Sequence, residues 1–162
     1  MKLKKWIAAF SIIALLASCS LSKTNRTYRK TIAGNWTLTN VSYANNQGLF
    51  KSTLFNDVSA QCFQGSTWFF RSNNSTGNYN INSASCNPGE RYIRWSVVES
   101  DMGPAQLQFK FTDEKKNDVS GGVGYRLNIE SLTDTQMVLT TNTTTDGGEA
   151  ITVKYNFVRN AN

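Results

Sequence analysis

The chain has 162 residues, a formal net charge of +6 and no histidine. Seven of its 17 Lys and Arg residues precede Thr31, and from Thr31 onward ten basic residues nearly balance eleven acidic ones. The excess positive charge therefore belongs to the N-terminal segment, and it gives no reason to expect nucleic-acid binding by the folded part. Without histidine, the chain also lacks the commonest catalytic base and the commonest metal ligand.

The chain opens as a secretory leader. Three lysines within the first five residues precede an apolar run from Trp6 to Ala17, which is too short to span a bilayer as an ordinary helix. The run ends in Leu16-Ala17-Ser18-Cys19, which resembles the lipobox of bacterial lipoprotein signals. That resemblance implies removal of residues 1–18 and attachment of acyl chains such as palmitate to Cys19, which anchor the protein in a membrane. The alternative is a plain signal peptide with a chance cysteine.

The polar segment 19–30 is predicted to be a lipidated tether. Its basic residues either lie against anionic lipid head groups or belong to a solvated linker. Ser20 follows Cys19, and by resemblance to the sorting rules of Gram-negative bacteria this favours the outer membrane, with the membrane face left open. The folded domain is predicted to span residues 31–160, a length that suits one domain.

Two cysteines, Cys62 and Cys86, bracket a predicted β-hairpin. Two aromatic and apolar runs, 68–70 and 79–81, flank a polar stretch that contains Asn and Gly, the residues that favour tight turns. With Cys19 used for lipid, these two cysteines form an even pair in an oxidising compartment, which predicts a disulfide. Two free thiols are the alternative, and a metal site is disfavoured because no second cysteine cluster exists.

Further strands are predicted where apolar and polar residues alternate with a period of two. With the hairpin included, about eight strands emerge, and each has one apolar face. Closing such strands into a barrel removes exposed sheet edges, so we expect an all-β, eight-stranded antiparallel barrel, with a sandwich as the second choice. The alternating segments lie at residues 36–39, 93–97, 107–112, 125–130, 136–141 and 151–157.

One longer connection, residues 44–61, interrupts the short turns. It carries the apolar residues Leu49, Phe50, Leu54 and Phe55 at near-helical spacing. We expect a short helix or lid that packs on one end of the barrel.

Several motifs together resemble a known family. They are the lipobox, the Gly34-Asn35-Trp36 start of the first strand, and the Cys-X-X-Gly-Ser-X-Trp-X-Phe pattern of Cys62 to Phe70. The ordered set, which continues to the closing strand at 151–157, resembles the lipocalin-like lipoproteins of Bacteroidota. The resemblance implies an up-and-down barrel anchored by lipid, without enzymatic activity.

Catalysis is not expected from this chain, and neither a metal nor a cofactor is expected. No Ser-X-X-Lys motif replaces the missing histidine. Pairs among four carboxylates could meet in space for glycoside cleavage, but each lies at a turn or an outward strand position, where solvated charge is the ordinary role. These are Asp101, Asp113, Glu130 and Glu149. The spacing of Asp113, Glu114 and Asp118 does not match a calcium-binding EF-hand loop.

Binding remains as the expected function. An eight-stranded barrel either holds one small ligand or is filled by its own side chains, so two hypotheses stay open. In the first, a barrel of the cell envelope binds a small hydrophobic ligand; in the second, a filled barrel is a structural protein that contacts another protein. The predicted interior residues are Trp68, Phe70, Tyr79, Trp95, Phe109, Phe111, Tyr125 and Tyr155.

Two other groups of residues complete the predicted site. Gly34 and Trp36 are predicted to be a structural plug at the closed end of the barrel. Arg91, Arg94 and Arg126 are candidate partners for a carboxylate at the mouth. The alternation around Arg94 and Arg126 predicts that these two face outward.

Overall fold

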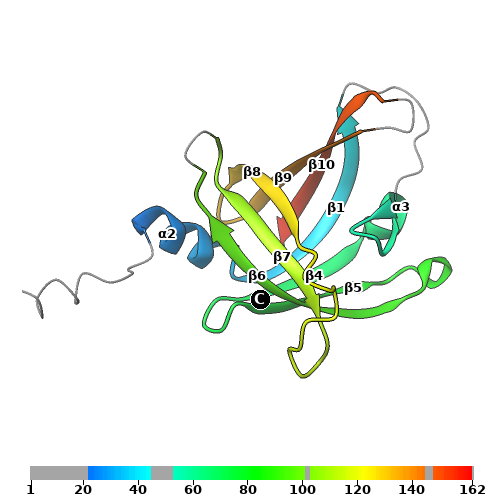
Figure 1. The fold of residues 1–162 in the computed structure, drawn as a ribbon, viewed down its shortest axis with the longest axis horizontal. Coiled ribbons are helices and arrows are strands. Elements are labelled where there is room, and N and C mark those ends of the chain that lie inside the picture. The colour runs from blue at the N-terminus through cyan, green and yellow to red at the C-terminus, as the bar shows by residue number, and fades with distance from the viewer. Residues whose placement is uncertain (1–21, 45–52, 101–102, 145–147, 162) are drawn as a thin grey trace, which may run out of the picture.

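Eight strands close into one antiparallel barrel in the computed structural model, which describes residues 22–44, 53–100, 103–144 and 148–161 (Figure 1). The strands neighbour one another around the barrel in the order β1-β10-β9-β8-β7-β6-β5-β4, so each pairs with its neighbour in the sequence and β1 closes the ring. The predicted up-and-down barrel is confirmed. Its strands are β1 (Gly34–Ala44), β4 (Ser66–Arg71), β5 (Thr76–Ile81), β6 (Gly89–Val98), β7 (Gln106–Thr112), β8 (Tyr125–Leu132), β9 (Gln136–Thr144) and β10 (Ala150–Arg159).

The alternation in the sequence explains which side chains face inward. In β10, Ile151, Val153, Tyr155 and Phe157 are buried, and the residues between them are more exposed. A strand turns successive side chains to opposite faces, so this pattern puts one apolar row inside the barrel. The interior is thereby built from the same residues that predicted the strands.

A short helix, α2 (Lys23–Ile32), closes one end of the barrel. Ser22 caps it by accepting a hydrogen bond from the Asn25 amide, and Ile32 at its last position is fully buried. Arg29 ties the helix to the barrel by donating to the Ser72 carbonyl at 2.6 Å. The prediction of a tether over residues 19–30 is therefore corrected for residues 23–30, because they form a helix that these contacts hold on the barrel.

The opposite end carries a small lid, which we define as residues 53–63. It consists of the hairpin strands β2 (Thr53–Leu54) and β3 (Val58–Ser59), followed by the one-turn helix α3 (Ala60–Phe63). Figure 1 shows α3 at the end of the barrel that lies away from α2. The predicted lid is thus present. Leu54 and Phe55 lie at its hairpin and not in α3, while Leu49 and Phe50 lie outside the described residues.

A disulfide between Cys62 and Cys86 fastens the lid to the barrel, as predicted. Cys62 belongs to α3, and Cys86 ends the short 3₁₀ helix η1 (Ala84–Cys86) between β5 and β6. The two Cα atoms are 5.5 Å apart, a usual separation for a disulfide.

Cys19 and the leader lie outside the described residues. Within the described ranges, no helix has both the length and the apolar character needed to cross a membrane.

Candidate functional site

The interior of the barrel brings together the aromatic residues that the sequence singled out. Six of the eight are at most 3% exposed, and the other two, Phe111 and Tyr125, are partly buried and pack against the same core. The six are Trp68, Phe70, Tyr79, Trp95, Phe109 and Tyr155. The predicted grouping is therefore present in space, although their role toward a ligand stays a prediction.

Trp68 lies at the centre of this cluster. Its ring stacks on Tyr79 with centroids 4.3 Å apart, and it meets Phe109 and Phe157 edge to face at 6.0 and 5.7 Å. Its indole nitrogen donates to the hydroxyl of Ser66 at 2.9 Å, and that hydroxyl donates to the Phe63 carbonyl. The one polar atom of this side chain is therefore paired, as burial requires.

The lid inserts Phe55 into the mouth of the barrel. The ring centroid of Phe55 lies 5.0 Å from that of Phe109, 5.3 Å from Tyr125 and 5.6 Å from Tyr155. Phe63, also from the lid, adds a contact at 5.4 Å and is fully buried. The sequence placed Phe55 in a lid, but its local pattern did not indicate that its side chain enters the aromatic cluster.

Phe55 adopts an unusual backbone conformation to do this. Phe55 and Asn56 have φ angles of +54°, and the Asp57 amide donates to the Leu54 carbonyl at 3.0 Å, which together make a type I′ turn. Gly and Asn suit such positions, whereas a bulky residue with positive φ is strained by about 1–3 kcal/mol. The burial of the Phe55 ring offsets this strain.

A polar latch holds the lid at the rim of the mouth. We give this name to Asp57, on the lid, with Tyr79 of β5 and Arg91 of β6. Arg91 donates to both carboxylate oxygens of Asp57, at 2.9 and 3.2 Å, and Tyr79 donates its hydroxyl to the same carboxylate at 2.7 Å. The guanidinium also donates to the Asn87 and Gly89 carbonyls. The predicted carboxylate partner of Arg91 at the mouth is thus part of the chain itself.

The latch changes the acid–base properties of Tyr79. Burial raises the pKa of the Tyr79 phenol far above its ordinary value, and the hydrogen bond to Asp57 raises it further. The phenol therefore stays protonated and remains a donor to the lid. Burial likewise raises the pKa of Tyr155, deeper in the cluster.

The closed end is built around Trp36, which is fully buried. Its indole nitrogen donates to the Ile32 carbonyl at 2.7 Å, and the Arg159 guanidinium lies 4.2 Å from its ring centroid. Arg159 also donates to the carbonyls of Thr31 and Ala33. Gly34 has φ +121°, and a Cβ there would meet an Arg159 nitrogen at 2.6 Å. Gly34 and Trp36 therefore lie at the barrel end next to α2, and Arg159 contacts both; their role as a structural plug stays a prediction.

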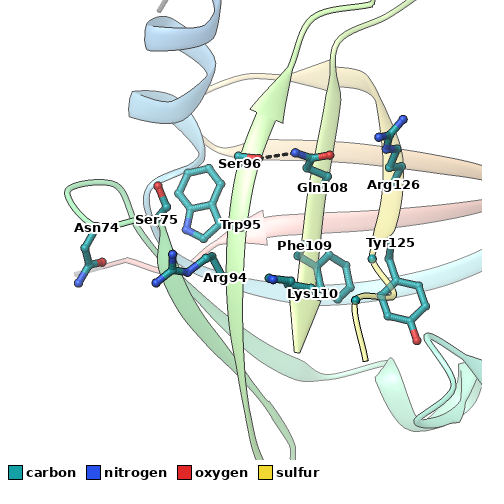
Figure 2. Close-up of a pocket in the computed structure, with 12 residues that line it drawn as sticks. Asn74, Ser75, Arg94, Trp95, Ser96, Gln108, Phe109, Lys110, Tyr125 and Arg126 are labelled. Carbon is teal, nitrogen blue, oxygen red and sulfur yellow. Dashed lines mark hydrogen bonds between the residues drawn. The ribbon is translucent and has the colours of Figure 1, made fainter. Parts of the chain in front are cut away.

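A second concave region lies on the outer wall of the barrel, and we call it the wall groove. It has a volume of about 540 Å³ and runs across β6, β7 and β8, between the turn at Asn74 and Ser75 and the glycines Gly122 and Gly124 (Figure 2). Such a volume is in the range of small-molecule sites. The groove was not predicted, because its residues come from three strands whose pairing is invisible in the sequence.

Three basic side chains line the wall groove: Arg94 on β6, Lys110 on β7 and Arg126 on β8. Arg94 and Arg126 are exposed, as their alternation predicted. Lys110 forms an ion pair with Asp118 at 2.6 Å, and this contact is the main cause that lowers the pKa of the Asp118 carboxyl below its ordinary range.

The carboxylates weighed for catalysis have structural partners where the structure describes them. Glu130 pairs with Lys154 at 2.7 Å, and Asp113 accepts hydrogen bonds from the amide and side chain of Asn117. Among the described residues, no group of three or more Cys, Asp or Glu side chains is arranged to hold a metal ion. Asp101 lies outside the described residues.

Comparison with known families agrees with this architecture. The sequence model of the lipocalin-like domain family matches residues 32–139, a stretch that runs from the end of α2 into β9. The chain belongs to the lipocalin-like domain family. The resemblance inferred from the motifs around Trp36 and Cys62 is thereby confirmed. No curated protein sequence matches this lipocalin-like chain.

Solved structures that match this chain include the following three proteins. A lipocalin-like protein from Bacteroides uniformis has 13% sequence identity and a TM-score of 0.46, with 80% of this chain and 99% of that chain covered. Bovine odorant-binding protein, in complex with a selenium-containing odorant, has 11% identity and a TM-score of 0.43, with 90% and 78% covered. Lobster apocrustacyanin A1 has 16% identity and a TM-score of 0.43, with 90% and 73% covered.

Proposed function

We propose that this lipocalin-like protein is anchored by lipid in the bacterial cell envelope and binds a small hydrophobic ligand inside its barrel. The observation that carries the ligand proposal is the Phe55 ring, which the lid inserts among the aromatic rings of Phe109, Tyr125 and Tyr155. This ring occupies a site that is apolar, aromatic and reached from the mouth. A ligand of the same character would take its place when the lid opens.

Two features of the lid favour such an exchange. The left-handed backbone at Phe55 is strained in the closed form, so its release on opening offsets part of the free energy that opening costs. The latch around Asp57 lies at the rim and is polar, so it can exchange its hydrogen bonds for water. The disulfide at Cys62 keeps the far side of the lid attached while the hairpin moves.

Photolabelling tests the ligand proposal. The full chain, in phosphatidylcholine nanodiscs, is exposed to a medium-chain fatty acid that carries a diazirine, and labelled peptides are mapped. We expect labels on interior residues such as Trp68 and Phe109. Phe55→Ala should raise the apparent affinity about tenfold, the equivalent of about 1.4 kcal/mol of closure cost removed.

Phe69→Ala is the matched control, because it removes the same side chain from the intermediate position between the buried Trp68 and Phe70 on β4. It should leave the labelling unchanged. Labels confined to outer-face residues, in wild type and in Phe55→Ala, would contradict the ligand proposal.

The filled barrel is the second candidate function. It is favoured by the close stacking of Trp68 on Tyr79 at 4.3 Å, which leaves no space between these two rings. In this case the barrel is a rigid support whose loops contact another envelope protein. Absence of interior labels in both variants, together with one reproducible partner after cross-linking in cells, would favour this candidate.

The lipid anchor is proposed from the sequence Leu16-Ala17-Ser18-Cys19. Cells that produce the chain are grown with an alkyne analogue of palmitate, and the purified protein is tested for label. The wild type should be labelled and Cys19→Ser should not. Equal labelling of both variants, or label in neither, would contradict the anchor.

A further inference from the structure

The wall groove lies on the outer face of the sheet, separate from the barrel interior. We infer that it binds an extended acidic saccharide, with anionic groups on different sugar units. Its charge, the spacing of its cations and the polarity of its lining point to this class of ligand.

The charge of the wall groove is not balanced within the described part of the chain. Arg94 pairs directly opposite Lys110 in the β6–β7 ladder, and like charges in that position destabilise a sheet. Asp118 neutralises Lys110. In the described ranges neither Arg94 nor Arg126 forms an ion pair, so the groove keeps two uncompensated positive charges. An anionic ligand would relieve this arrangement.

The two arginines of the groove come from strands that are not neighbours. Arg94 and Arg126 lie on β6 and β8, which are separated by β7, and adjacent strands are about 4.8 Å apart, so about 10 Å separates their backbones. Figure 2 shows the Lys110 side chain extending toward β6, while Arg126 lies on the far side of Gln108. Arg94 extends from β6 toward Asn74 and away from Arg126 (Figure 2), so a ligand that meets both arginines carries anionic groups at two separated points.

The surface between the cations is polar. Ser96 and Gln108 are joined by a hydrogen bond of 2.8 Å across β6 and β7 and remain partly exposed (Figure 2). Three aromatic residues are among the lining: Trp95 and Phe109 are 1% and 2% exposed and belong to the interior, whereas Tyr125 is partly exposed. The floor thus offers hydroxyl and amide groups to sugar hydroxyls, and the Tyr125 ring adds an apolar surface beside them.

Titration calorimetry on the full chain in phosphatidylcholine nanodiscs tests this inference with three probes. Trigalacturonic acid carries carboxylates, a heparin-derived tetrasaccharide carries sulfates as well, and maltotriose is neutral. We expect at least one acidic probe to bind, with an affinity that falls as salt is raised, and maltotriose not to bind. Binding of neither acidic probe, or equal binding of maltotriose, would overturn the inference.

Charge-matched variants locate the site. The double variant Arg94→Gln and Arg126→Gln should weaken binding of the acidic probe about tenfold, because charge-assisted hydrogen bonds at two points are lost. The control Lys23→Gln and Arg26→Gln removes the same charge from exposed positions of α2. It should change Kd less than about twofold, because salt screens the interaction of distant exposed charges with the probe. An equal loss in both would show nonspecific attraction and overturn the site.

Thermal unfolding shows whether the variants are folded, and interior photolabelling shows whether the barrel site still binds its ligand. Together they distinguish either of these defects from a loss of binding in the groove. Both double variants should melt at the wild-type temperature, because all four side chains are exposed. Photolabelling of the interior should be unaffected by the groove variants. If Gln108→Glu, which places a negative charge on the floor, left binding of the acidic probe unchanged, the groove would be excluded as its site.

Discussion

Asp57 and Arg91 join the lid to the barrel wall through two parallel hydrogen bonds, at 2.9 and 3.2 Å. The same carboxylate accepts the Tyr79 hydroxyl, so one side chain of the lid contacts two strands. The disulfide from Cys62 to Cys86 makes a covalent connection between the lid and the β5–β6 loop. The lid is therefore fastened by one covalent and one ionic contact, and each can be tested separately.

Asp57→Asn should destabilise the protein by about 1–3 kcal/mol, because the buried Tyr79 and the partly buried Arg91 lose a charged acceptor. Urea unfolding gives the free energy. Asp134→Asn, at an exposed position, is the control and should change stability by less than about 0.5 kcal/mol. Equal effects of the two substitutions would show that the latch does not stabilise the fold.

Stability should fall at alkaline pH. Folding raises the pKa of Tyr79 and Tyr155 above the ordinary value of 10.0, so in the folded protein both stay protonated while the unfolded chain releases these protons. Their contribution is complete below pH 10 and is lost as pH rises toward the folded pKa, by about 1.4 kcal/mol per pH unit for each tyrosine.

Urea unfolding between pH 9 and 11.5 measures this slope. Tyr79→Phe should reduce the slope of unfolding free energy against pH by the contribution of one tyrosine, about 1.4 kcal/mol per pH unit. Tyr155→Phe should have the same effect. An unchanged slope in both variants would contradict the assignment of the alkaline transition to these phenols.

Gly34→Ala should destabilise the closed end by about 1–3 kcal/mol or more, because it combines a strained φ of +121° with a contact of 2.6 Å to Arg159. Gly148→Ala shares the positive φ but meets no atom within 4 Å. Thermal unfolding should therefore show a larger loss for Gly34→Ala. If the two variants lost the same stability, the contact with Arg159 would not be the cause.

Replacement of both Cys62 and Cys86 by serine should cost about 3 kcal/mol, the usual effect of opening a loop of this length in the chain-entropy model. Reduction of the wild type should give the same stability as the double variant in urea unfolding. A reducing agent should have no effect on the double variant. If the fully reduced wild type kept the stability of the oxidised protein, the prediction would be contradicted.

The strands and the disulfide were accessible from sequence because their signals are local. The alternation from Ile151 to Phe157 appears within one segment, and a strand converts it directly into an inner and an outer face. Cys62 and Cys86 were paired by counting cysteines and by their position at the ends of one hairpin. These features need no knowledge of the rest of the fold.

Helix α2 and the conformation of the lid turn at Phe55 were not predicted, because both depend on distant contacts. The segment 23–32 is polar, with few apolar residues, and its place as a helix depends on Arg29 reaching Ser72 and on the burial of Ile32. Phenylalanine disfavours positive φ. At Phe55 this backbone strain is offset by contacts with aromatic rings of three distant strands. In both places tertiary packing overrides local preference.

The sequence by itself determined the all-β barrel, the family and the aromatic character of the interior, because period-two alternation and ordered motifs are properties of neighbouring residues. Only the tertiary structure decided what occupies the mouth and which charges meet on the wall. Phe55 among the interior rings, Asp57 on Arg91, and Arg94 opposite Lys110 are contacts set by the pairing register and closure of the sheet. That register brings together residues from separate segments, and no local pattern encodes their proximity.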